Sequence, residues 1–264
     1  MHGLNLGCQQ HANGNTLVFI CDPPGATLQD YALNLEHMYN EFKHFCSENK
    51  IDCSLPEFTP ANVSRESREH FPMHKCKAAN GKVVSNFLAK KTFDMHMLAP
   101  DDEPLREVAV LMWGLADFQI GMDEYEMFLS DDEAARLYHA GRTFLYTYHM
   151  LAVKAFRNNV NMWLIVPKFH YLAHLVMDLP KDLVNPRFYH CFGDEDFVGK
   201  IAAIGHRVHR ARNADRTIDR YLIALFDVWE TYKATHRDLG RDRAIAAAEA
   251  QAGGRPRKRR RVAH

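Results

Sequence analysis

Residues 27–45 read TLQDYALNLEHMYNEFKHF, and this stretch indicates the fold class of the chain. Its apolar residues recur at the i, i+3, i+4 and i+7 spacing of one helix face, from Leu28 through Leu35 and Phe42 to Phe45. Thr27 is suited to cap the helix, and Asp30 lies in the first turn, where the helix dipole favours an anion. The stretch therefore predicts an amphipathic α-helix that packs on a hydrophobic core.

Outward from this helix, the same period predicts further helices. They cover 82–98, the residues from Pro104 to Leu115, the residues from the capping box at Ser130 to about Phe156, then 168–178, 195–211 and 216–236. Prolines interrupt residues 49–80, and Trp163–Val166 fits either a short strand or the start of a helix. We therefore expect a mainly α, irregular helical domain over residues 1–238. Residues 239–264 are expected to form an Ala-rich helix and a disordered basic tail.

The charges of the 264 residues cancel, with 33 Lys and Arg against 33 Asp and Glu, but they are unevenly distributed. Residues 101–133 contain eleven acids and one base, Arg106, whereas residues 255–261 contain six bases. The acidic segment is therefore a candidate binding surface for a basic partner, or a solvated face. No run of about 18 apolar residues predicts a membrane span, and the first residues do not resemble a secretory signal.

Cysteine and histidine are concentrated between residues 46 and 76. The six cysteines contain no Cys-x-x-Cys pair, and without a secretory signal we expect reduced thiols rather than a disulfide framework. Cys46, Cys53, His74 and Cys76 are candidate ligands of a tetrahedral zinc ion. The alternative is a set of separate buried thiols and surface histidines.

Two further groups of residues are candidate metal sites. His170 and His174 are four residues apart on one helix face, where they can hold a metal ion or orient a phosphate, and His2 is a third candidate ligand. The alternative for this pair is ordinary packing. Three consecutive acids, Asp194, Glu195 and Asp196, follow a glycine. They are candidate ligands for Mg²⁺ in phosphoryl transfer. The alternative is that they form an acidic helix N-terminus.

Basic residues follow directly. The candidate nucleic-acid contacts are Lys200, Arg207, Arg210, Arg212, Arg216 and Arg220. The last three repeat every four residues, and Asp215 and Asp219 are placed to pair with some of them instead. Arg257, Lys258, Arg259, Arg260 and Arg261 are typical of a nuclear localisation signal, which a nuclear import receptor would read. The same tail suits nucleic-acid binding without sequence preference, or serves only solubility.

Together these segments resemble the C-terminal part of a CACTA-like DDE transposase. The resemblance rests on Met1–Cys8, on the Pro-Lys-x-His-x-Leu-x-His-Leu pattern of Pro167–Leu175, on Asn185–Arg187, and on the acids at 194–196. It implies that 27–160 correspond to a helical insertion and 161–238 to the end of a split RNase H-like catalytic fold. One or two short strands would then remain, and Glu195 would be the last catalytic acid of a Mg²⁺-dependent site.

The chain departs from that family at its start. The Asp of the family's Asp-x-x-His motif would precede Met1, as would the other acids of the metal site. We therefore expect a truncated, transposable-element-derived nuclear protein that binds DNA and lacks a complete catalytic site. The alternative is a helical protein-interaction module that uses the acidic segment 101–133.

Overall fold

The structure is a computed structural model that describes residues 4–189, 202–204, 206, 216–224 and 226–227. The chain forms two compact units, unit 1 from Met1 to Cys191 and unit 2 from Phe192 to His264. The described residues confirm the predicted mainly helical fold. Their one β-type contact is an isolated bridge between Phe128 and Val184. The predicted boundary after residue 238 and the basic tail lie outside the described residues.

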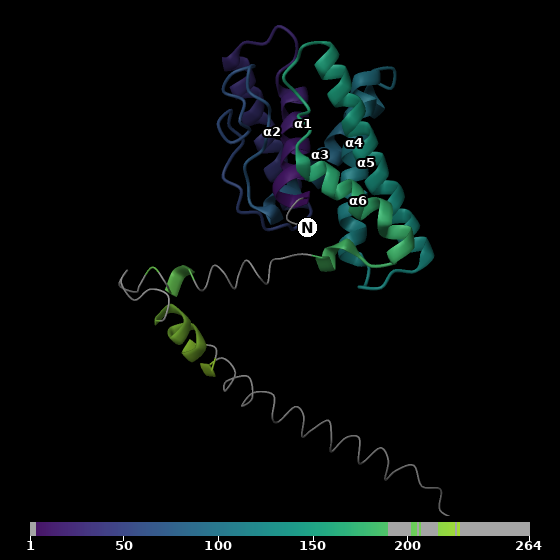
Figure 1. Cartoon of the computed structure of the whole chain (residues 1–264). Coiled ribbons are helices and arrows are strands. Elements are labelled where there is room, and N and C mark those ends of the chain that lie inside the picture. Colours follow the sequence, from purple (N-terminus) through teal and green to yellow (C-terminus); the bar gives the residue numbers. More distant parts are fainter. Residues whose placement is uncertain (1–3, 190–201, 205, 207–215, 225, 228–264) are drawn as a thin grey trace, which may run out of the picture. The chain divides into compact units, whose positions relative to one another are not determined.

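The described residues of unit 1 form six α-helices with a short helix before the first and after the last (Figure 1). A π-helix, Leu4–Cys8, leads into α1 (Gln9–Cys21), and α2 (Leu28–Glu48), α3 (Ala78–Leu98), α4 (Glu103–Glu124), α5 (Asp131–Arg157), α6 (Pro167–Asp182) and the 3₁₀-helix Pro186–Tyr189 follow. In unit 2, residues 216–224 and 226–227 are helical. Of the two alternatives for Trp163–Val166, the strand is not formed, and α6 begins directly after Val166.

The starts of α2 and α5 follow from local capping. Thr27 accepts a hydrogen bond from the backbone of Asp30, whose carboxylate accepts one back from the Thr27 backbone at 2.9 Å. The same reciprocal pair joins Ser130 and Glu133 at the start of α5. The N-cap at Thr27 and the capping box at Ser130 both stand where the sequence predicts them. Pro167 in the first turn of α6 needs no amide partner there, so it begins the helix rather than breaking it.

Helix α1 was not predicted, because its residues form no apolar stripe. Gln9, His11, Asn13, Asn15 and Thr16 are all buried in it, together with Leu17 and Val18. In Figure 1, α1 lies between α2 on one side and α3–α6 on the other. A helix that is enclosed on all sides has no solvent face, and so the amphipathic signal that marks α2 and α5 cannot arise.

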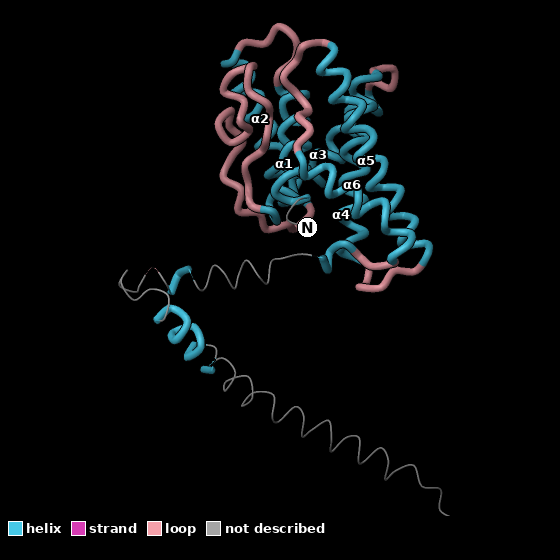
Figure 2. Tube along the Cα trace, viewed as in Figure 1, coloured by secondary structure: helices cyan, strands magenta, loops and turns pink. Residues whose placement is uncertain are grey.

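The helices α3–α6 form the other half of unit 1, with α4 packed between α3 and α5, and α6 packed on α5. The close approach of α4 and α5 depends on Gly114, where an added Cβ would lie 2.9 Å from the backbone nitrogen of Phe144. Residues 49–77 form a long irregular segment beside α2, as the proline positions predict (Figure 2). No helix in the described part of the chain is long and apolar enough to cross a membrane.

Candidate functional site

The exposed face of α6 carries the two histidines that the sequence singles out. Because Phe169, Leu172, Val176 and Leu179 are buried, the opposite face of the helix is turned to solvent. His170 and His174 lie there one turn apart, and their Nε2 atoms approach to 3.1 Å. The two rings are nearly perpendicular, with centroids 4.5 Å apart. The structure therefore brings this predicted pair together, whereas His2 lies outside the described residues.

The backbone under this pair is held firmly against α5. The ring of Phe169 lies 4.2 Å from that of Tyr148 and stacks on Phe144 at 6.2 Å, measured between centroids. Val176 is fully buried and packs closely on Gly141. A Cβ added to Gly141 would lie 2.6 Å from the Cγ2 atom of Val176. Positions 170 and 174 are thus fixed in space, and only the rotamers of the two histidines remain adjustable.

The four predicted zinc ligands do not form a metal site in the structure. His74 is fully buried, its ring lies edge-on to Phe58 at 5.4 Å, and neither ring nitrogen has a hydrogen-bond partner. Burial lowers the pKa of His74 to about 4, so its ring is neutral near pH 7. Burial and then a nearby Cys53 thiolate raise the pKa of Cys76 to about 12. Among the described residues, no three His, Cys, Asp or Glu side chains are arranged around one metal position.

The buried polar side chains of α1 bind segments that are distant in sequence. Asn13 Nδ2 donates to the carbonyl of Gly81 at 2.8 Å, and Asn13 Oδ1 accepts from Ser85 Oγ at 2.9 Å. Gln9 Oε1 accepts from Gln119 Nε2 at 2.8 Å. No amphipathic pattern in residues 9–16 indicates this helix. This network connects α1 to α3 and α4 and has a structural role.

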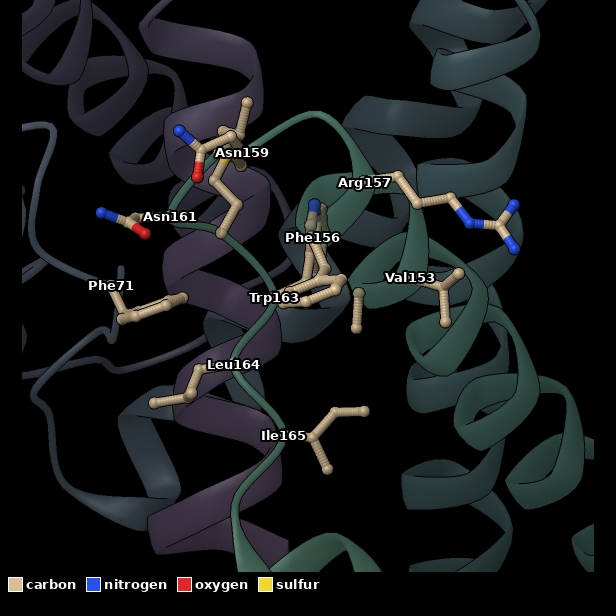
Figure 3. Close-up of a pocket in the computed structure, with 12 residues that line it drawn as sticks. Phe71, Val153, Phe156, Arg157, Asn159, Asn161, Trp163, Leu164 and Ile165 are labelled. Atoms are coloured by element: carbon tan, nitrogen blue, oxygen red, sulfur yellow. The ribbon is translucent and has the colours of Figure 1, made fainter.

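A pocket of about 450 Å³ lies where α5 ends (Figure 3). Its walls come from Phe71, from Val153 and Phe156 on α5, and from residues 159–165. In Figure 3 the side chains of Leu164 and Ile165 leave that segment on opposite sides. Arg157 is the one charged residue among those lining it, so the pocket suits an apolar group better than acid–base chemistry. No local sequence pattern indicated this pocket.

The acidic segment 101–133 is largely engaged within unit 1. Glu103 and Glu107 lie 3.6 and 2.5 Å from Lys154 Nζ, and Asp117 lies 2.6 Å from Arg136. Asp123 pairs with Lys82, whereas Asp102 and Glu133 cap α4 and α5. The five remaining acids of the segment are exposed and form neither an ion pair nor a helix cap within the described part of unit 1, namely Asp101, Glu124, Glu126, Asp131 and Asp132. The high acid content therefore reflects helix capping and ion pairing as much as an outward surface.

The predicted DNA contacts and catalytic acids all belong to unit 2. Arg216 and Arg220 are exposed, one turn apart, on the helical residues 216–224. The other predicted residues of this group lie outside the described residues, namely Asp194, Glu195, Asp196, Lys200, Arg207, Arg210, Arg212 and Arg257–Arg261.

Comparisons with models of protein families, with curated proteins and with solved structures gave no match to this chain.

Proposed function

We propose that the chain is a transposable-element-derived nuclear protein that binds duplex DNA through its basic C-terminal unit. The observation that carries the proposal is the separation of charge between the two units. Residues 1–191 contain 17 Lys and Arg against 23 Asp and Glu, whereas residues 192–264 contain 16 against 10. An acidic body repels the phosphate backbone and a basic unit attracts it, so binding would be confined to unit 2.

Within unit 2, the exposed positions of Arg216 and Arg220 support the same proposal. Residues one helical turn apart on one face can contact successive phosphates along a groove. The sequence places Arg212 one turn before them. Such contacts orient a protein on DNA without reading its sequence, so we expect affinity with little sequence preference.

The test is retention of labelled duplex DNA by the full-length chain over a range of salt concentrations. Each phosphate that is neutralised should contribute about −0.9 to the slope of log affinity against log salt. Replacing Arg212, Arg216 and Arg220 by Gln should flatten this slope by up to about 0.9 for each phosphate that is no longer neutralised. The matched control replaces three exposed arginines of unit 1, Arg106, Arg142 and Arg157, and should leave the slope unchanged. A wild-type slope near zero would exclude DNA binding.

The catalytic part of the family resemblance is tested separately. Asp194, Glu195 and Asp196 are the residues that would hold Mg²⁺, an ion that activates water and stabilises the leaving oxygen in phosphoryl transfer. Because three consecutive acids do not by themselves form a two-metal site, we propose that the chain binds DNA without cleaving it. A strand-nicking assay with Mg²⁺ that detects activity lost in Glu195→Ala would overturn this part alone.

We propose a nuclear location from the positive charge of the C-terminal tail. The residues Arg257, Lys258, Arg259, Arg260 and Arg261 supply the dense positive charge that a nuclear import receptor recognises. Replacing these five residues by Gln in a fluorescent fusion should shift the protein from nucleus to cytoplasm. The control is the arginine variant of unit 1, which should remain nuclear. Unchanged nuclear accumulation of the tail variant would contradict the assignment.

A further inference from the structure

The distance between His170 and His174 is the distance that two ligands of one metal ion require. Zinc–imidazole bonds are about 2.0–2.1 Å long. Two Nε2 atoms that are 3.1 Å apart can therefore both bind one ion at an angle of roughly 100°, between the octahedral and tetrahedral values. We propose that His170 and His174 chelate a divalent late transition-metal ion, such as Cu²⁺ or Zn²⁺, on the exposed face of α6.

Helix α6 holds the two ligands in this arrangement before any metal arrives. Its buried face, which includes Phe169 and Val176, fixes the helix on α5, and His170 and His174 are the fourth and eighth residues of the helix. Binding therefore requires only small rotations about the side-chain bonds of two residues. This preorganisation lowers the entropic cost of chelation and distinguishes the pair from two histidines on a mobile loop.

The chemistry of the ligands selects the class of ion. Neutral imidazole nitrogen suits Cu²⁺, Ni²⁺ and Zn²⁺, whereas Mg²⁺ and Ca²⁺ prefer oxygen ligands. No third His, Cys, Asp or Glu of the described residues joins the pair, so water would fill the remaining positions. A site with two protein ligands and open positions exchanges its ion readily and can also accept a ligand from another molecule. The site is distinct from the predicted Mg²⁺ ligands at residues 194–196.

A direct hydrogen bond between the two imidazoles is the competing explanation for the same distance. In that case one ring donates from Nε2–H and the other accepts, and no ion is needed. The two explanations differ in their response to added metal. A chelate gains affinity from having both rings present, so removing either ring should lose nearly the whole effect. Two independent surface histidines would each contribute a similar, additive part.

The experiment uses the full-length chain without a polyhistidine tag, titrated with ZnCl₂ in a calorimeter. His170→Ala and His174→Ala should each weaken the tightest Zn²⁺ site by about 10- to 100-fold, and the double variant should be little worse than either. His149→Ala removes an exposed histidine of α5 and should leave that site unchanged. MgCl₂ should not bind to the histidine pair, so any heat of Mg²⁺ binding should be the same in the wild type and in His170→Ala.

A second variant keeps the number of histidines constant. In His174→Ala with Leu175→His, the second imidazole moves off the shared face of α6, and the tight site should be lost. Electron paramagnetic resonance of the Cu²⁺-loaded wild type should show two coordinated nitrogens, and that of His170→Ala fewer. Wild-type affinity in either single variant, or in the variant with the shifted histidine, would overturn the proposal.

Discussion

The backbone N–H of Trp163 donates a hydrogen bond of 2.6 Å to Oδ1 of Asn15, which joins the segment after α5 to the middle of the buried helix α1. Trp163 has a φ of 58°, a left-handed conformation that costs a bulky residue about 1–3 kcal/mol. The amide of Asn15 also donates to the carbonyls of His11 at 2.7 Å and Pro72 at 3.3 Å. One buried side chain therefore stabilises three separate parts of unit 1.

We expect Asn15→Ala to lower the free energy of unfolding by about 2–4 kcal/mol, because it leaves buried backbone groups without hydrogen-bond partners. Urea denaturation followed by circular dichroism measures this change. The control is Asn40→Ala, an exposed position on α2, which should change stability by no more than about 0.5 kcal/mol. Equal stability of the two variants would contradict the structural role of Asn15.

The stability of unit 1 should fall as pH decreases from about 6.5 to 4, because His74 stays neutral in the folded state. Its pKa is lowered from 6.5 to about 4 by burial, so the unfolded chain binds a proton in this interval and the folded chain does not. Stability therefore rises with pH across this window, by at most about 1.4 kcal/mol for each pH unit from this group.

His74→Phe tests this origin of the pH dependence, since Phe fills a similar volume and cannot be protonated. The slope of unfolding free energy against pH between 4 and 6.5 should become smaller than in the wild type. His70→Phe, at an exposed neighbouring position, is the control and should retain the wild-type slope. If His74→Phe has the same slope as the wild type, the pH dependence arises from other groups.

Gly114→Ala should destabilise the protein, although Ala normally stabilises a helix relative to Gly. The new Cβ would lie 2.9 Å from the nitrogen of Phe144 and 3.1 Å from the carbonyl oxygen of Ala140, both in the backbone of α5. Relieving this contact must separate two helices, and we expect a loss of about 1–3 kcal/mol. In an exposed helix the same change would gain up to about 1 kcal/mol. Thermal unfolding shows whether the Gly114→Ala variant is less or more stable than the wild type.

Ser130→Ala should cost about 1 kcal/mol, because it removes the side chain that caps α5. Hydrogen bonds from the Ser130 backbone and then from its side chain lower the pKa of Glu133, so loss of the hydroxyl should raise that pKa part of the way back. Chemical denaturation and a carboxyl titration by NMR measure the two effects. Ser47→Ala, on the exposed face of α2, should show neither.

Sequence patterns identified those elements whose two faces differ in polarity. Helices α2, α4, α5 and α6 each bury one stripe, so their apolar period marked them, although α4 continues to Glu124, nine residues beyond the predicted Leu115. Helix α1 was missed for the opposite physical reason. Its residues Asn13 and Asn15 are buried and bind backbone groups of Gly81, Pro72 and Trp163, which lie far away in the sequence.

The candidate site was predictable only where its residues are close in sequence. The spacing of His170 and His174 within one helix was enough to place both rings on one face. Cys46, Cys53, His74 and Cys76 come from separate segments, and their positions depend on how 49–77 folds against α2. The pocket beside Phe71 and Trp163 likewise depends on tertiary packing, which no local pattern encodes.

The polar interior of α1 has a consequence for how unit 1 assembles. A helix that is held only by apolar contacts specifies its alignment less strictly, because the hydrophobic effect is not directional. If α1 slid by a turn or rotated, Asn13, Asn15 and Gln9 would lose their partners together, at about 1–3 kcal/mol for each buried group. We therefore expect the polar contacts of α1 to be formed in only one alignment of this helix with its neighbours. Loss of these contacts would disfavour misassembled forms of unit 1. A partly docked α1 would lose the same contacts, so it would be as unfavourable as an unfolded helix.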